Sequence, residues 1–254
     1  MYAKQSLGQN FLMHARIAER IAKTALLTSE SVAFEIGPGT GMLTRELLKR
    51  AGKVIAIEAD DELFAQLQRD FVREIALGRL ELLHGDIRTF DISKLPKGYA
   101  LVANIPYYLT GEIFRMLLQS ENQPNSMTLL VQKEVAERVA RSKKESILSL
   151  SIKAYGTPKY EFTVPRGAFS PAPKVDSAVL TIRDISRKNF LSRTEEETFF
   201  TLVRAGFAHK RKFVRSNLAG LVTEEALRDA GACEGARAED LPLTGWLALS
   251  TVEK

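Results

Sequence analysis

Asn104-Ile105-Pro106-Tyr107 is the segment of this sequence whose residue types say most about chemistry. The Asn104 amide oxygen and the Ile105 carbonyl could each accept one hydrogen of an exocyclic adenine amine, which would favour a pyramidal nitrogen with its lone pair available for attack. Pro106 restricts the local backbone, and Tyr107 offers an aromatic face on which a base can stack. The segment therefore predicts group transfer to the amine of an unstacked adenine. The alternative is an ordinary strand-ending turn, in which Asn and Pro are common.

A glycine-rich loop lies upstream of this segment. Glu35-Ile36-Gly37-Pro38-Gly39-Thr40-Gly41 follows a short apolar run and opens a helical pattern, so Gly37 and Gly39 could let the backbone approach a ligand at a helix N-terminus. The glycines fall at alternate positions, unlike the G-x-G-x-x-G pattern of dinucleotide sites, and Pro38 lacks the N–H that a diphosphate would use. By itself the loop could also be a tight strand-to-helix turn.

Two acidic residues end the next two apolar runs. Glu58 could accept the hydroxyls of a ribose, and Asp86 could accept from the exocyclic amine of adenine. Each acid alone could be an exposed loop residue. Because Glu58 and Asp86 follow the glycine loop in this order, the three features together predict an adenosine pocket without a diphosphate site. Such a pocket suits S-adenosylmethionine better than NAD. A sulfonium is already an activated leaving group, so orientation and hydrogen bonding would suffice for catalysis.

The elements that must position these residues follow an alternating rhythm. Short, mostly uniform apolar runs alternate with helical patterns, which is typical of a parallel sheet covered on both faces. The expected strands are 32–36, 53–58, 80–83, 100–103 and 127–131, followed by a hairpin-like pair at 160–164 and 177–182 that closes the sheet. After Arg183 only helical patterns remain. The prediction is an α/β Rossmann-like domain in residues 1–186, mostly parallel with a closing antiparallel strand, and a small all-helical C-terminal domain in residues 187–254.

Composition excludes several classes of protein. With 45% hydrophobic and 26% charged residues, the chain has the values of a folded globular protein rather than a disordered or fibrous one. The lone Cys233 and three separated histidines offer neither a disulfide nor a zinc site, so no metal is expected. Charges interrupt every apolar stretch before the roughly 20 residues that a membrane span needs, and the N-terminus lacks a signal-peptide pattern. We therefore expect a cytoplasmic protein without a membrane segment.

Basic residues gather in two places and favour a polyanionic partner. The chain has 36 Lys and Arg against 31 Asp and Glu, a net charge of +5. No acid lies between Val203 and Thr223, where Arg204, Arg211 and Arg215 would share one face of a continuous helix. A solvated basic face is the alternative. The predicted RNA-binding residues are Arg138, Arg141, Lys143, Lys144, Arg204, Lys210, Arg211, Lys212 and Arg215.

Four segments occur in the order seen in the ribosomal RNA adenine dimethyltransferases, and the chain resembles the bacterial small-subunit type of that family. They are 6–12 (SLGQNFL), 35–41 (EIGPGTG), 104–107 (NIPY) and 169–177 (FSPAPKVDS). The resemblance implies an S-adenosylmethionine-dependent methyltransferase fold. It also implies dimethylation of the N6 amines of two adjacent adenines in a hairpin loop near the 3′ end of small-subunit (16S) rRNA, late in ribosome assembly. The expected partner is this rRNA within a partly assembled small subunit, and the expected enzyme is a monomer.

The resemblance also implies roles for single residues. Asn10, Leu12 and Gly37 would contact the cofactor, with Asn10 and Leu12 at its methionine end, and Phe169 would stack on the target base opposite Tyr107. The predicted cofactor-binding set is Asn10, Leu12, Gly37, Gly39, Glu58, Asp86 and Asn104, and the predicted catalytic set is Asn104, Ile105, Pro106, Tyr107 and Phe169. The chain departs from the family pattern at Tyr108, where many members carry Asn, and at 209–212 (HKRK), where an Arg-Arg-Lys triplet is more usual.

Three alternatives stay open from the sequence. A large-subunit rRNA adenine methyltransferase of the macrolide-resistance type shares the segments. A ribosome assembly factor or RNA-binding protein without catalysis would tolerate loss of Asn104, Tyr107 and Glu58, all of which are present. An NAD-dependent oxidoreductase would need a diphosphate-binding loop that is not evident.

Overall fold

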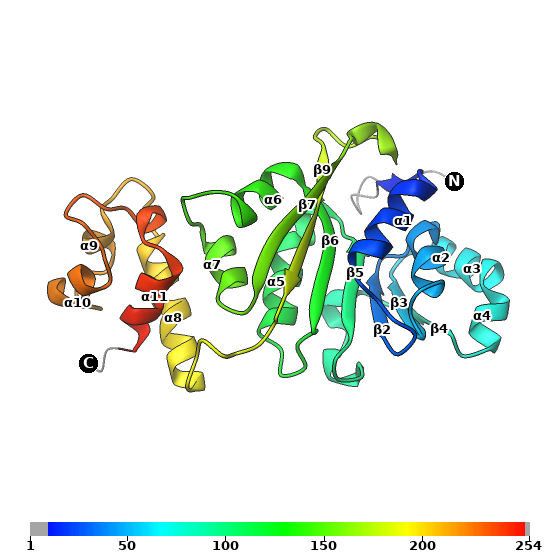
Figure 1. The fold of residues 1–254 in the computed structure, drawn as a ribbon, viewed down its shortest axis with the longest axis horizontal. Helices are drawn as coiled ribbons and strands as arrows, with labels where there is room; N and C mark the ends of the chain where they lie inside the picture. The colour runs from blue at the N-terminus through cyan, green and yellow to red at the C-terminus, as the bar shows by residue number, and fades with distance from the viewer. Residues whose placement is uncertain (1–9, 252–254) are drawn as a thin grey trace. The chain divides into compact units, whose positions relative to one another are not determined.

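The computed structural model describes residues 10–251 of the chain (Figure 1). Residues 6–9 of the first family segment lie outside this range. The strands are β1 (Phe11–Leu12), β2 (Val32–Ile36), β3 (Lys53–Glu58), β4 (Leu80–His84), β5 (Ala100–Asn104), β6 (Ser126–Gln132), β7 (Thr157–Val164), β8 (Phe169–Ser170) and β9 (Ser177–Arg183). The α-helices are α1 (Ala15–Thr24), α2 (Met42–Leu48), α3 (Asp61–Asp70), α4 (Val72–Ala76), α5 (Thr110–Leu118), α6 (Lys133–Ala140), α7 (Ile147–Lys153), α8 (Arg193–Gly206), α9 (Val214–Asn217), α10 (Glu224–Asp229) and α11 (Leu243–Ser250).

A seven-stranded sheet in the order β4-β3-β2-β5-β6-β9-β7 organises the N-terminal part of the chain. Strands β2 to β6 pair in parallel, and β9 pairs antiparallel with β6, which confirms the predicted fold class. The order reverses between β2 and β5. Ligands bind at such a switch point, beyond the carboxyl ends of the strands.

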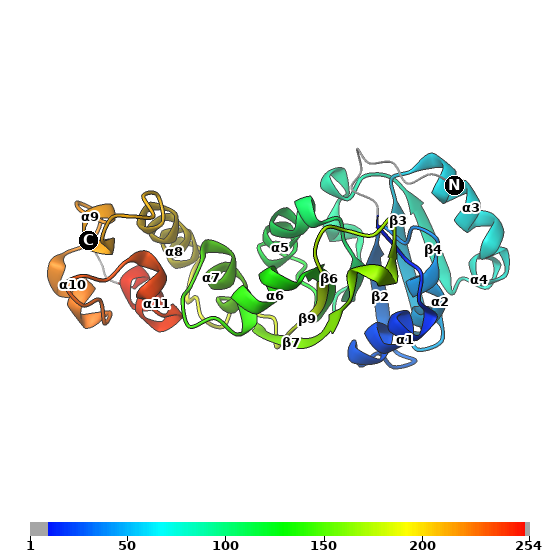
Figure 2. The same cartoon turned by 90° about the horizontal axis from the view of Figure 1, so that it is seen from above.

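Helices cover both faces of this sheet, and α1 and α5 lie on opposite faces (Figure 2). Because both faces are covered, β3 and β5 consist almost entirely of buried residues, as the apolar residues at their centres predict. Helices α1 and α2 pack together over β2 and β3, and Ile21, Leu47 and Val54 in this core are fully buried.

A two-stranded sheet that the sequence did not predict joins distant parts of the chain. Phe11 and Leu12 of β1 pair antiparallel with Ser170 and Phe169 of β8. Each strand has only two residues, too few for an alternating pattern to be detectable. The pairing fixes the N-terminal segment beside the proline-rich loop.

The chain forms two compact units, residues 1–136 with 159–185 and residues 137–158 with 186–254. The sequence-based division at residues 186/187 assigned 137–158 to the N-terminal domain, whereas the structure packs this segment with the C-terminal helices. Tyr155 explains the difference, because it is fully buried, its ring stacks on Phe200 at 6.0 Å, and its hydroxyl donates to Glu196. A fully buried Trp246 on α11 packs against Gly206 in the same unit.

The expected continuous basic helix does not form. Helix α8 ends at Gly206, and the chain turns before α9 begins at Val214. The Asn217 side-chain amide stabilises this break by donating to the carbonyls of Gly206 and His209. Arg204 therefore lies on α8 and Arg215 on α9, so the prediction that Arg204, Arg211 and Arg215 share one helix face is wrong.

Candidate functional site

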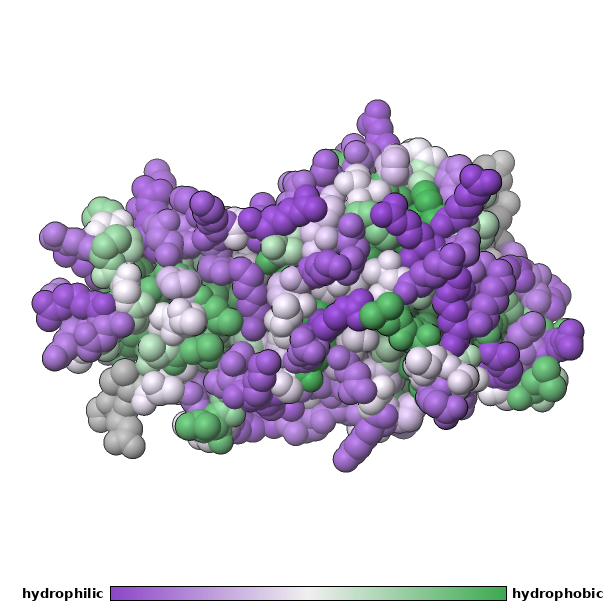
Figure 3. Space-filling model, viewed as in Figure 1, coloured by the Kyte–Doolittle hydropathy of each residue, from purple (hydrophilic) through white to green (hydrophobic). Residues whose placement is uncertain are grey.

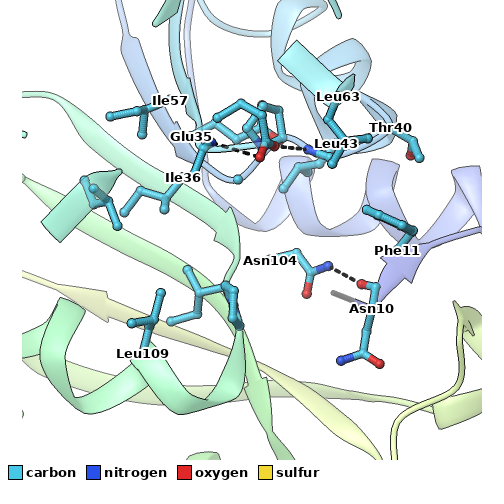
Figure 4. A pocket seen from close by; sticks show the side chains of 18 of the residues that line it. Asn10, Phe11, Glu35, Ile36, Thr40, Leu43, Ile57, Leu63, Asn104 and Leu109 are labelled. Carbon is cyan, nitrogen blue, oxygen red and sulfur yellow. Dashed lines mark hydrogen bonds between the residues drawn. The ribbon is translucent and has the colours of Figure 1, made fainter. Parts of the chain in front are cut away.

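A pocket lies at the carboxyl ends of β2, β3, β4 and β5 (Figure 4). The structure brings all of the predicted cofactor-binding residues into its lining: Asn10, Leu12, Gly37, Gly39, Glu58, Asp86 and Asn104. Four predicted catalytic residues, 104–107, line it as well. The fifth, Phe169, does not.

The glycine loop uses its own N–H groups to hold its shape. Gly37 N–H donates to Ile57 O at 2.9 Å, and Gly41 N–H donates to Pro38 O at 2.9 Å. Gly39 N–H donates to the Glu58 carboxylate at 3.0 Å. All three glycines have positive φ, which favours glycine over any side chain. Since Pro38 has no N–H, none of these four residues offers a backbone donor to a ligand phosphate.

Glu58 is almost fully buried at the end of β3, and backbone groups surround its carboxylate. Oε2 accepts from Gly39 N, while Oε1 accepts from Ala59 N and Asp60 N, each at 3.0 Å. Burial nevertheless raises the pKa of the Glu58 carboxyl, and these hydrogen bonds oppose the rise. A carboxylate has about four lone-pair positions, so about one remains for a ribose hydroxyl.

Glu35 is a second buried acid in the lining, and the sequence did not identify it as a site residue in its own right. Its Oε2 accepts from the Thr44 hydroxyl at 2.7 Å, and only 1% of the residue is exposed. Burial raises the pKa of Glu35 to about 8, helped by the nearby charge of Glu58 and opposed by the Thr44 hydrogen bond. The sequence feature that could have identified Glu35 is the presence of an acidic residue inside an otherwise apolar strand.

Asp86 follows β4 and is held by Arg88, a lining residue that sequence reasoning missed. The Arg88 backbone N–H donates to Oδ1 at 2.9 Å, Nε lies 3.1 and 3.0 Å from the two oxygens, and a terminal guanidinium nitrogen also binds Oδ2. Arg88 holds the pKa of the Asp86 carboxyl below its ordinary value. An adenine amine that donates to Asp86 must therefore displace part of this ion pair.

Asn104 ends β5 and has a fixed orientation. Its Nδ2 donates to Asn10 O at 3.0 Å (Figure 4). Because a backbone carbonyl can only accept, the amide atom facing Asn10 is the nitrogen, and Oδ1 is directed elsewhere. Packing of β1 against the pocket therefore leaves Asn104 with a defined acceptor atom.

Two tyrosines continue the lining beyond Asn104. Tyr107 is partly buried, and its hydroxyl lies 2.6 Å from the Ser177 hydroxyl, while Tyr108 is 58% exposed at the pocket. Phe169 was expected to face Tyr107 across a target base. Instead it is 5% exposed and packs in the core with Leu12 and Val179, because β8 pairs with β1.

The predicted RNA-binding residues are all exposed, and all nine belong to the second compact unit. In that unit Lys144 forms ion pairs with Glu239 and Asp240, and Arg215 forms one with Glu234 at 3.7 Å. Hydrophilic side chains project from much of the visible surface (Figure 3). The 138–144 cluster, although distant in sequence from the C-terminal basic residues, belongs to the same compact unit as they do.

Residues 10–251 contain no group of three or more His, Cys, Asp or Glu side chains that could hold a metal ion. In the same range, no helix has the length and apolarity required to cross a bilayer.

Comparison with known proteins gives consistent matches. Residues 1–251 match the model of a family described as ribosomal RNA adenine dimethylase. Ribosomal RNA small subunit methyltransferase A from Dehalococcoides mccartyi is 40% identical over 257 residues, which cover 97% of this chain and 87% of the relative. The protein of the same name from Listeria welshimeri is 39% identical over 85% of this chain and 76% of its own length.

Two solved structures are similar over nearly the whole chain. A dimethyladenosine transferase from Plasmodium falciparum has a TM-score of 0.80 at 25% identity, covering 94% of this chain and 95% of that one. The 23S rRNA methyltransferase ErmE has a TM-score of 0.79 at 28% identity, covering 95% and 98% respectively.

Proposed function

Because the chain belongs to the ribosomal RNA adenine dimethylase family, we propose that it dimethylates the N6 amines of two adjacent adenines in small-subunit rRNA, with S-adenosylmethionine as methyl donor. Its similarity over nearly full length to relatives named small subunit methyltransferase A supports the choice of RNA. The substrate is the 3′-end hairpin loop within a partly assembled small subunit, and the enzyme acts as a cytoplasmic monomer late in assembly.

The glycine loop is the observation that carries the choice of cofactor. The N–H groups of Gly37, Gly39 and Gly41 are all engaged within the protein and Pro38 has none, so these four positions suit a ligand without a diphosphate. Within residues 10–251, the lining contains one base, Arg88, which is ion-paired with Asp86, so this lining offers no unpaired cation to a polyanionic ligand. S-adenosylmethionine, when bound, supplies an electrophilic methyl group on its sulfonium. Glu58 and Asp86 would hold its ribose and adenine.

Asn104 and Ile105 would prepare the target amine. Asn104 Oδ1, oriented by the hydrogen bond from Nδ2 to Asn10, would accept one amine hydrogen, and the Ile105 carbonyl would accept another. Withdrawing these hydrogens toward two fixed acceptors favours a pyramidal nitrogen, whose lone pair is then available for attack. Pro106, with φ of −56°, restrains the backbone that carries this carbonyl.

The exposed basic residues would hold the RNA backbone. All nine are basic side chains in one compact unit, which suits contact with phosphates. The target adenine must leave its stack to reach a pocket at a sheet edge, which costs least in a loop. Tyr107 and Tyr108 provide aromatic surface for the unstacked base.

Methyl transfer to defined RNAs tests this proposal. The purified chain should transfer labelled methyl groups from S-adenosylmethionine to small-subunit particles lacking dimethyladenosine. Asn104→Ala should reduce that transfer by at least about a hundredfold, while RNA binding changes little, because the basic residues are untouched. Near-normal transfer by this variant would exclude the proposed role of Asn104.

The similarity to ErmE makes large-subunit rRNA the second candidate substrate. Large-subunit RNA is therefore assayed in parallel, and primer extension on both rRNAs locates the modified bases. Modification confined to the large-subunit RNA would reject the small-subunit assignment. Calorimetry with S-adenosylmethionine and NAD tests the cofactor separately.

A further inference from the structure

Ser177 is joined to the candidate site by a side-chain hydrogen bond to Tyr107. It is fully buried at the start of β9 and is not part of the pocket lining. Its hydroxyl lies 2.6 Å from the hydroxyl of Tyr107, which does line the pocket. The bond joins residues that are 70 positions apart in the sequence.

The backbone around Ser177 is held from two sides. Ser177 pairs with Gln132 of β6, the same strand whose Leu130 pairs with Asn104. Beside it, the Asp176 carbonyl accepts from Lys133 N at 3.0 Å, and the Asp176 carboxylate accepts from Arg166 N at 2.9 Å. Ser177 is therefore a rigid anchor whose position is tied to the strand next to Asn104.

Tyr107 is the second partner of this hydrogen bond. It follows Pro106 in a single turn of 3₁₀ helix after β5, and two side-chain torsions set the direction of its ring. Burial raises the pKa of the Tyr107 hydroxyl, so the group stays protonated and able to share a hydrogen with Ser177. A hydrogen bond from the tip of the ring to a buried, backbone-fixed hydroxyl restricts both torsions.

We propose that Ser177 is a positioning residue: it fixes the ring of Tyr107 at the angle that the target base meets, and so couples the FSPAPKVDS segment to the NIPY segment. This role rests on the proposed function, since the ring matters only if a base stacks there. Ser177 touches neither the base nor the cofactor. Its removal should therefore lower the rate of methyl transfer without weakening cofactor binding.

Ser177→Ala and Tyr107→Phe remove the same hydrogen bond from opposite ends. Each should lower kcat for methyl transfer by about tenfold, with the dissociation constant for S-adenosylmethionine unchanged within about twofold. The double variant should lose no more than the stronger single variant, because the bond can be lost only once. Thr181→Val is the matched control: Thr181 is a buried hydroxyl on the same strand, but it donates to Glu161 at 2.8 Å, outside the pocket lining. This control should keep the wild-type kcat.

A second measurement needs no activity. The chain has six tyrosines, so after incorporation of 3-fluorotyrosine the ¹⁹F resonance of Tyr107 can be assigned as the one missing in Tyr107→Phe. Ser177→Ala should shift this resonance and leave the other five in place, whereas Thr181→Val should not move it. Tyr107→Phe keeps Ser177 and the buried strand intact, so it tests the role even if Ser177→Ala folds poorly.

The outcomes separate the two proposals. If the wild-type chain methylates neither rRNA, the proposed function fails, whatever the Tyr107 resonance does. If the wild type is active and Ser177→Ala keeps its kcat, or the two single losses multiply in the double variant, the positioning role is overturned. An unshifted Tyr107 resonance in Ser177→Ala overturns it as well.

Discussion

Replacing Glu35 with Gln tests whether this buried carboxyl makes the protein less stable as the pH rises. Burial raises the pKa of Glu35 to about 8 in the folded state, against 4.5 for the ordinary group. Between these values the unfolded chain releases the proton and the folded chain retains it. The contribution of Glu35 to the free energy of unfolding is thus fully present below pH 4.5 and is lost as the pH rises towards 8.

The magnitude follows from the size of the shift. One pKa unit corresponds to about 1.4 kcal/mol, so wild-type stability should fall by about 2 to 3 kcal/mol between pH 5.5 and pH 7.5 through Glu35 alone. In Glu35→Gln the side chain cannot ionise, and its carbonyl can still accept from the Thr44 hydroxyl. Any cost of burying the extra amide hydrogens is the same at every pH. The quantity to compare is therefore the change in the free energy of unfolding with pH, and not its absolute value.

Urea unfolding of the ligand-free protein, followed by circular dichroism at half-unit steps from pH 5.5 to 7.5, measures this slope. The burial of Glu58 also raises its pKa, but that group is present in both proteins, so the comparison of slopes isolates Glu35. Thr44→Val is the control, because it removes the hydrogen bond and keeps the carboxyl, and it should retain the wild-type decline. Parallel curves for wild type and Glu35→Gln would refute the assignment of a raised pKa to Glu35.

Two further predictions concern the loop and the adenine end of the pocket. Gly41→Ala should lower the free energy of unfolding by about 2 to 4 kcal/mol, because the residue has φ of +74° and an added Cβ would lie 2.5 Å from the Phe71 ring. Gly37→Ala has a similar φ of +64° but open space around it, so it should lose only about 1 kcal/mol; equal losses in urea unfolding would contradict the role of Phe71. Arg88→Ala should tighten S-adenosylmethionine binding by about twofold to fivefold in calorimetry, since the Asp86 carboxylate no longer has to leave a guanidinium. Weaker binding by this variant would show that Arg88 assists the ligand.

Local patterns in the sequence were sufficient for the main sheet. The mostly apolar runs at β2, β3, β5 and β6 predicted buried parallel strands, because a strand covered on both faces does not alternate between apolar and polar residues. Chain order then placed the glycine loop, Glu58 and Asp86 at one edge. Much of the pocket lining therefore followed from the sequence without knowledge of long-range contacts.

The basic helix and the domain division show where local patterns failed. The charges and apolar spacing between Val203 and Leu218 resemble those of one amphipathic helix. Helix α8 nevertheless ends at Gly206, where Trp246 of α11 occupies the space that a side chain would fill. Likewise, Tyr155 carries no local signal that its ring packs on Phe200. Both outcomes depend on partners that are distant in sequence.

By itself, the sequence determined the fold class, the sheet edge at which a ligand binds, and the residue types available there, because each of these depends on local periodicity and chain order. Tertiary structure alone decided which atoms of those residues are available. It directed the Asn104 amide nitrogen to Asn10, engaged the loop N–H groups with Glu58 and the backbone, and joined Tyr107 to Ser177. It also placed Phe169 in the hydrophobic core, where sequence reasoning had expected it to face the target base. These results follow from hydrogen bonds and packing between segments that are brought together only when the chain folds.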